Sequence, residues 1–511
     1  MRDSKTPGLK IWAALRSSLI VAAGVGALVS FPAVAAPWTV TPELQVRGNY
    51  TDNIGLAAPG LEQSQTVVDL SPGIKIHGEG ARVKMDVDYS VQTLSYLGDS
   101  SHNTYNNQLA ANAGLEAIEN WMFIDATAQV SQQNVSAFGP QPVDNINLTG
   151  NRTQVSSYSV SPYIKGVIGP GVAYQLRFNA YGSDSAASQL PRSQSSEWLG
   201  SLQGGTPLSF LSWGLDFNQR RSDYAGSPSI ETDAYHATLN FPVDPQLSLS
   251  VNAGEEKNNF LLGQQSSSSH GFGFSWMPSA TTSLVGQRDQ RPFGPGYSLA
   301  FKHRMPMSSL DVRLSRDYSS TPDVLFRGLG TTMYSMLYDA TSATLTPAER
   351  NSMVTAYLQA AGLSPTMVPT LAYATNRIVI QKTLQVAYAI IGARNTLTFT
   401  ALSSDSASAD AGFTVADDFA KFSSVAQKGL NVNWNHQLSG RTSFNAAWGR
   451  LLLTGDGVGS ADSRQNTLSM GLTTVLSPKS NASFGVRHVK LDGTTLGYRE
   501  NAMFLSLSFL F

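Results

Sequence analysis

The chain has 511 residues, of which 41% are hydrophobic but only 14% are charged, and its formal net charge is −1. Cysteine is absent, which excludes disulfides and thiolate metal sites. The even charge balance gives no basic field of the kind that nucleic-acid-binding proteins carry, so no nucleic-acid partner is predicted.

The N-terminal segment, residues 1–35, has the pattern of a secretory signal peptide. Basic residues precede the apolar stretch Ser17–Val29, and Ala33-Val34-Ala35 then offers small residues for cleavage. The apolar stretch is too short for a comfortable membrane span, although a permanent anchor helix is the alternative. We therefore expect an exported protein whose mature chain, residues 36–511, forms a single domain.

Alternating apolar and polar residues recur from Trp38 to the end of the chain. Val172, Tyr174, Leu176 and Phe178 alternate with polar or small residues, and the same period recurs in residues 83–92, 211–218, 235–241 and 430–435. Period two predicts strands of a sheet with one apolar face.

Beyond the signal peptide, no apolar stretch approaches the length of a membrane helix. Such a chain can enter lipid only as a closed barrel, because every backbone polar group must then bond within the protein. The sequence predicts an all-β fold, a transmembrane antiparallel up-and-down β-barrel of about 22 strands. A soluble barrel has the same period with its apolar face inward. The many half-apolar strands, with Arg and Asp in their polar sets, favour the membrane form.

Short and long connections are predicted to alternate along the chain. Tight turns are expected at residues 78–80, 118–120, 169–171, 206–207, 243–245, 277–279, 306–308, 392–394, 438–440 and 477–479. Longer polar loops separate them, for example residues 136–150, 183–194 and 405–417. Short periplasmic turns and long extracellular loops are the outer-membrane pattern.

The longest connection, residues 321–373, carries a helix signal. Thr346 and Glu349 form a capping box around Pro347, and the pattern predicts a helix at about residues 347–361 that ends before Gly362. A loop this long is usually functional. Plugged receptors of 22 strands carry a separate N-terminal domain, whereas here the first strand follows the signal peptide closely. We therefore expect this loop to fold inward and constrict the lumen.

Three elements near the mature N-terminus resemble a known family: Trp38-Thr39-Val40-Thr41-Pro42, Tyr50-Thr51-Asp52-Asn53-Ile54 and Leu70-Ser71-Pro72-Gly73-Ile74. They are similar to the opening of outer-membrane proteins associated with the PEP-CTERM/exosortase system and with exopolysaccharide gene clusters. The second element also occurs in neighbouring barrel families linked to polysaccharide export. The resemblance covers only the first few dozen mature residues and implies a barrel that acts in polysaccharide export. It brings no catalytic residues, and from the residues alone Asp52-Asn53 is simply an extracellular turn.

Three sets of residues are predicted to have roles in such a barrel. Charged side chains expected to line the lumen are Lys84, Asp86, Asp88, Arg177, Asp216, Arg220, Lys302, Arg304, Asp311, Arg313 and Arg487. They either create a transverse field for hydrated solutes or merely brace the wall with salt bridges. Trp38, Trp121, Trp213, Trp276 and Trp434 are expected to form a periplasmic aromatic girdle. Phe509 and Phe511 close the last strand in the manner of a barrel-assembly signal.

The motifs of common enzymes are absent: no nucleophile elbow, phosphate-binding loop or dinucleotide fingerprint occurs. His236 and His436 are assigned to the lumen face by alternation, where a pore lining is favoured over catalysis because neither shows a positioned partner. The acidic loops 405–418 and 456–462 lack calcium-ligand spacing. No cofactor or metal is predicted.

The pattern as a whole predicts an outer-membrane channel, a porin-like component of exopolysaccharide export. A non-conducting structural or docking barrel is the alternative, and an outer-membrane enzyme with a Ser/His/Asp cluster near a rim is a third reading. The expected partners are outer-membrane lipid and lipopolysaccharide, the barrel-assembly machinery, polysaccharide and periplasmic export proteins. The even charge balance predicts no strong ion selectivity.

Overall fold

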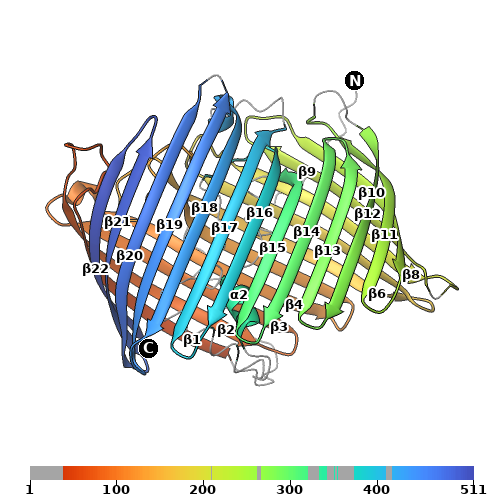
Figure 1. The fold of residues 1–511 in the computed structure, drawn as a ribbon, viewed down its shortest axis with the longest axis horizontal. Helices are drawn as coiled ribbons and strands as arrows, with labels where there is room; N and C mark the ends of the chain where they lie inside the picture. Colours follow the sequence, from red (N-terminus) through yellow and green to blue (C-terminus); the bar gives the residue numbers. More distant parts are fainter. Residues whose placement is uncertain are drawn as a thin grey trace.

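A computed structural model describes residues 38–208, 210–261, 266–319, 333–341, 350, 354, 373–409, 417–457 and 459–511. Its strands form one antiparallel 22-stranded sheet in which each strand pairs with its neighbours in sequence. The first strand, β1, also pairs with the last, β22, so the sheet closes into a barrel (Figure 1). The predicted all-β barrel and its strand number are confirmed.

The strands are β1 (Trp38–Thr51), β2 (Gln65–Glu79), β3 (Val83–Tyr96), β4 (Thr104–Ile118), β5 (Met122–Asn134), β6 (Arg152–Ile168), β7 (Val172–Ser185), β8 (Ser193–Gly205), β9 (Ser212–Tyr224), β10 (Ile230–Pro242), β11 (Leu247–Asn258), β12 (Ser266–Ser279), β13 (Thr282–Arg291), β14 (Gly294–Met305), β15 (Ser308–Ser319), β16 (Val379–Ile391), β17 (Asn395–Ser408), β18 (Phe422–Gln437), β19 (Thr442–Gly457), β20 (Ala461–Ser477), β21 (Ser480–Gly493) and β22 (Tyr498–Leu510). The described helical elements are the 3-10 turns η2 (Ser100–His102) and η3 (Asp418–Ala420) and the helix α2 (Met333–Ala340).

The alternation of the strands gives the barrel an apolar outer face. Large apolar side chains stay exposed along it, such as Val251 at 47% and Leu505 at 58%. Residues opposite each other in the register share a face, so Leu505 lies beside Phe484 and Gly48 on the same outer surface. The intervening residues, such as Ser506, face the lumen. Exposed apolar surface on this scale requires a partner phase.

All ten predicted tight turns join consecutive strands, and we call the end of the barrel that carries them the turn end. One is displaced: β12 continues to Ser279 through an irregular register after Trp276, so the turn itself is residues 280–281. The opposite end, the loop end, carries the longer connections. Three of these are short, contrary to the strict alternation expected: residues 292–293, 458–460 and 494–497. The first closes tightly because Gly294 takes the left-handed conformation (φ 94°).

Strands also extend into the expected loops 183–194 and 405–417: β7 ends at Ser185, β8 begins at Ser193 and β17 ends at Ser408. The helix expected at residues 347–361 lies outside the described residues except for residues 350 and 354. The helix α2, within the same connection, was not predicted. Among the residues that the structure describes, none of the helical segments has both the length and the apolar character needed to cross a membrane.

Candidate functional site: the barrel lumen

The lumen-facing charges pair mostly with close neighbours on the inner wall. Register and exposure place all eleven predicted lining residues on the inner face: Lys84, Asp86, Asp88, Arg177, Asp216, Arg220, Lys302, Arg304, Asp311, Arg313 and Arg487. Arg177 bonds Asp125 across strands at 3.0 Å, and Arg313 bonds Asp311 on its own strand at 2.9 Å. Such pairs brace the wall and also hold opposite charges at the water-filled surface.

A cavity of about 680 Å³ lies along the inner faces of β8 to β15. His236 and Arg291 both contact the Glu256 carboxylate, at 3.4 and 2.9 Å, and Arg291 also bonds Asp317. Amide, hydroxyl and charged groups therefore converge on one space, as in sites that hold polar ligands. Towards the loop end an apolar cluster covers the cavity, formed by Tyr224, Ile230, Phe260 and Ile378.

One glycine makes a cross-strand bond in this wall possible. Asn252 of β11 donates to the Asp289 carboxylate of β13 at 2.7 Å, and Gly271 of β12 lies between them in the register. A Cβ on Gly271 would stand 2.0 Å from the Asp289 Oδ1 atom. Any other residue at position 271 would therefore have to displace this bond.

The connection between β5 and β6, residues 135–151, folds into the lumen at the loop end. Ile146 packs on the inner-face residues Val67, Leu94 and Tyr96, and it is 1% exposed. The Asp144 carboxylate lies 3.2 Å from Arg47 Nη2 of β1 and 3.4 Å from Arg487 Nη1 of β21.

The ionic contacts of residues 135–151 favour the charged form of Asp144. Burial by itself would raise the Asp144 pKa, but the guanidinium groups of Arg47 and Arg487 outweigh it and lower the pKa below its usual value. Asn147 adds a 2.7 Å hydrogen bond to the Glu500 carboxylate of β22. The segment is thus tied to three strands around the point where the barrel closes.

Two further segments at the loop end complete this inner layer. The Asp418 carboxylate of η3 accepts 2.7 Å bonds from the Ser136 hydroxyl and the Ala137 N–H. Burial raises the pKa of Asp418 in spite of these donors. Arg377, at the end of the long connection, bonds Asp417 at 2.8 Å, and both side chains are buried. The long connection thereby joins residues 135–151 and η3 across the loop end.

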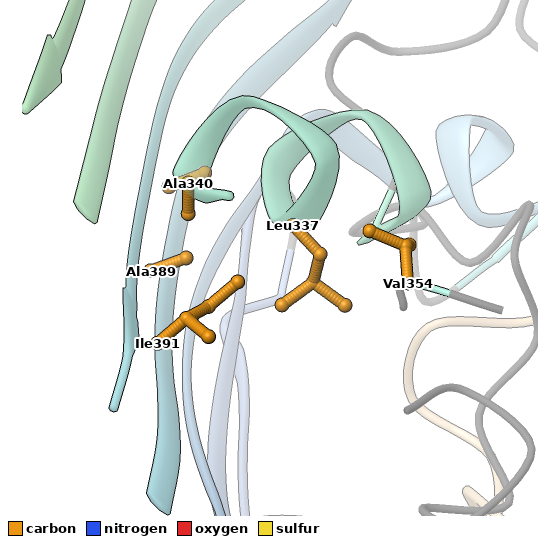
Figure 2. Packing of buried hydrophobic residues seen from close by; sticks show 6 residues of the cluster. Leu337, Ala340, Val354, Ala389 and Ile391 are labelled. Carbon is orange, nitrogen blue, oxygen red and sulfur yellow. The ribbon is translucent and has the colours of Figure 1, made fainter. Parts of the chain in front are cut away.

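The helix α2 lies inside the barrel at the turn end. Figure 2 shows Leu337 and Ala340 of α2 facing Ala389 and Ile391 of β16. Asp339 of α2 also bonds Lys302 on β14 at 2.5 Å. The described helix of the long connection, α2, lies at the turn end, which also holds the C-terminal end of β22, whereas β15 ends and β16 begins at the loop end (Figure 1). The helix α2 therefore lies in the lumen, and the constriction expected from this connection stays a prediction.

The structure places His436 on the outer face of the barrel and His102 in a capped turn at the rim. His436 was assigned to the lumen, but it shares the outer face with Trp434, its ring centroid 5.9 Å away, because residues two apart in a strand point the same way. Asp99, Ser101 and His102 lie together at the rim, as an enzyme would require. However, Asp99 and Ser101 both contact the same His102 nitrogen, Nδ1, at 2.8 and 3.4 Å, and Asp99 accepts the Ser101 N–H. This is a turn cap, since a triad uses the two ring nitrogens separately.

The predicted girdle residues all lie close to the turn end: Trp38, Trp121, Trp213, Trp276 and Trp434. Phe509 pairs with Leu44 and Ser480 at the barrel closure, and Phe511 is exposed. Within the described part of the chain, no group of three or more His, Asp or Glu side chains is arranged to hold a metal ion.

No family model and no curated protein matches the chain. Among solved structures, it is similar to the siderophore receptor PirA from Acinetobacter baumannii, with 8% identity over 93% of this chain and 81% of that chain and a TM-score of 0.47. It is also similar to a ferric enterobactin receptor (PfeA) mutant from Pseudomonas aeruginosa in complex with enterobactin, with 10% identity over 93% of this chain and 82% of that chain and a TM-score of 0.48. OccK8 (OprE) from Pseudomonas aeruginosa matches with 11% identity over 92% of this chain and 98% of that chain and a TM-score of 0.31. These low values carry no argument about activity.

The closed strands, the apolar outer face and the polar lumen together satisfy what lipid demands of a spanning sheet. The chain has the fold of an outer-membrane β-barrel. Because fold does not fix function, the role of this barrel has to be argued from its lumen.

Proposed function

We propose that this protein is an outer-membrane channel for polar solutes, closed in the state described here by its own inward segments. The observation that carries the proposal is the 680 Å³ polar cavity, which runs along the inner wall beneath the cluster of Tyr224, Ile230, Phe260 and Ile378. Hydroxyl, amide and ionic groups that line a lumen can replace water as hydrogen-bond partners of a hydrated solute at little cost in free energy.

The cargo we propose is a saccharide, in keeping with a role in exopolysaccharide export associated with the PEP-CTERM system. This part rests on the resemblance of residues 38–74 to that family. The cavity chemistry is compatible with it, since Asn252, Asn218 and His236 are groups that hydrogen-bond sugar hydroxyls. In this proposal residues 1–35 direct export, the turn end faces the periplasm, and periplasmic export proteins deliver the cargo.

Liposome swelling tests the channel directly. The refolded mature protein is reconstituted into liposomes, which are then placed in isotonic solutions of neutral saccharides of increasing size. A channel closed by its own segments predicts little swelling with the natural form and, when residues 135–151 are shortened, swelling that slows as the saccharide grows. Absence of swelling in both forms, with folding verified by heat-modifiable gel mobility, contradicts the proposal.

The alternative is a non-conducting docking barrel, which the inward segments specifically favour. Residues 135–151, η3 and Arg377 are joined by buried contacts such as Arg377–Asp417, which is expected if the lumen stays permanently shut. If a variant that lacks these contacts is still impermeable, the docking barrel is favoured over the channel.

A further inference from the structure

Two arginines form a cationic pocket in the lumen, on either side of the strand that closes the barrel. Arg47 projects from β1 and Arg487 from β21, with β22 between them. The Arg47 guanidinium lies 4.2 Å from the Phe504 ring centroid, and Arg487 also bonds Glu500 at 3.2 Å. Both arginines are thus held in place by groups of the wall, independently of any occupant.

The occupant of this pocket is a carboxylate that belongs to the chain itself. Asp144 meets both guanidinium groups, at 3.2 and 3.4 Å. Arg152 comes close as well, because it donates a 2.6 Å bond to the Asp144 backbone carbonyl. Three guanidinium groups therefore surround the carboxylates of Asp144 and Glu500, and the buried Asp69 carboxylate lies opposite Arg47 in the β1–β2 register.

The pocket has donor capacity that Asp144 does not use. The Nε atoms of Arg47 and Arg487 are buried and have no hydrogen-bond partner among the described residues. The Arg487 side chain is only 8% exposed, whereas Arg47 is 21% exposed and can be reached from the lumen. Guanidinium groups bind carboxylates through paired N–H donors, so an anion with a better fit could engage these free positions.

We propose that Arg47 and Arg487 form a binding site for carboxylate-bearing solutes, and that Asp144 is its internal occupant. A solute carboxylate takes the place of Asp144, and residues 135–151 then leave the lumen. The inference deepens the proposed channel and rests on it for its physiological meaning. The site would make the cargo, or a signal that accompanies it, an acidic saccharide or another organic acid.

Competition with a tethered group sets the concentration at which this works. A group on a short flexible segment has an effective concentration on the order of millimolar, so a free carboxylate must reach or exceed that range. Ile146 and Asn147 add packing and a hydrogen bond that also hold the segment. Displacement should therefore be graded with concentration.

Thiol labelling tests the proposal in a background that suits it, because the chain contains no cysteine. Ile146→Cys places the only thiol at a position that is 1% exposed and becomes reactive when the segment leaves. Val143→Cys, at a 48% exposed position of the same segment, is the matched control that labels throughout. The probe is sodium glucuronate, titrated from about 1 to about 100 mM to span the effective concentration of a tethered group. Glucose with sodium chloride at equal ionic strength is the control.

We expect glucuronate to speed the labelling of Ile146→Cys by about tenfold, which corresponds to the loss of one charge-assisted contact. Glucose should have no effect, and adding Asp144→Asn should give fast labelling without any solute. Adding Arg47→Gln should abolish the response to glucuronate. A rate that glucuronate leaves unchanged, while the Asp144→Asn form labels fast, overturns the site; slow labelling of the Asp144→Asn form overturns the role of Asp144.

Conductance recorded on the same proteins separates this inference from the proposed function. Labelling that responds to glucuronate, in a barrel that never conducts, leaves the carboxylate site standing and contradicts the channel. Conduction without any labelling response does the reverse.

Discussion

The Asp52 carboxylate, just after β1, accepts two hydrogen bonds of 2.7 Å from Asn501 of β22, one from its backbone N–H and one from its side-chain amide. Thr51 and Asn53 also reach across, to the Glu500 carboxylate and the Arg499 carbonyl, each at 2.9 Å. Because β1 pairs with β22 over nine residues but with β2 over fourteen, these bonds lengthen the shorter pairing. The Tyr-Thr-Asp-Asn-Ile element thus fastens the first strand to the last.

Asp52→Ala should weaken this closure of the barrel. It removes both side-chain bonds to Asn501, a loss on the order of 1 kcal/mol. The measurement is the temperature at which the barrel loses its heat-modifiable gel mobility. Asp223→Ala is the control, because Asp223 contacts Arg221 and Ser229 within a single hairpin and makes no bond across the closure. Equal losses in both variants would contradict a special role for the closure.

Leu337→Ala should loosen α2 from the inner wall. Leu337 is 1% exposed and packs on Ala389 and Ile391, and truncating a buried leucine costs about 2–5 kcal/mol. We expect larger single-channel conductance in planar bilayers. Val285→Ala is the control, because Val285 faces the lumen at 42% exposure. A Leu337→Ala conductance equal to that of the control would show that α2 does not obstruct the path.

Acid should release residues 135–151. The Asp144 pKa is lowered by Arg47 and Arg487, so its contribution is fully present above the ordinary value of 3.8 and is lost as the pH falls through the lowered value. Cleavage after Phe138 or Leu148 by an acid protease, followed by mass spectrometry, should therefore rise only below pH 3.8. Asp144→Asn should remove this step; a step that survives in that variant would assign it to another group.

Arg177→Gln should make the pore more selective for cations. It leaves the Asp125 carboxylate without the guanidinium that lies 3.0 Å away. The reversal potential in a potassium chloride gradient measures the change. Combining Arg177→Gln with Asp125→Asn should restore the ion selectivity of the natural protein. If the single variant leaves selectivity unaltered, the pair only braces the wall.

Much of the barrel could be predicted because its constraints are local. Alternation in stretches such as residues 172–179 fixes both strand and face, and turn residues such as Gly169-Pro170-Gly171 mark the ends. The errors arose where local rules compete. His436 follows Trp434 by two residues and therefore shares its outer face. The turn at residues 292–293 contains no glycine of its own, because the left-handed conformation is taken by Gly294, the first residue of the next strand.

The contents of the lumen were harder to predict, because they depend on contacts between segments far apart in the chain. Asp144, Arg47 and Arg487 have no sequence pattern in common. The sequence contains one indication of α2, because residues 386–391 of β16 are apolar on both faces. An apolar inner face formed by Ala387, Ala389 and Ile391 indicates that another segment packs on it from within the lumen. In the same way, apolar inner-face residues near the loop end, such as Val67 and Leu94, indicate that residues 135–151 pack on them.

The central claim is that the barrel is a channel closed by its own inward segments. The most direct test is single-channel recording of the refolded mature protein beside the Asp144→Asn, Leu337→Asn double variant, both verified as folded by heat-modifiable mobility. We predict little or no conductance for the natural protein and steady openings for the variant. A folded double variant that stays silent would contradict the claim and favour the docking barrel.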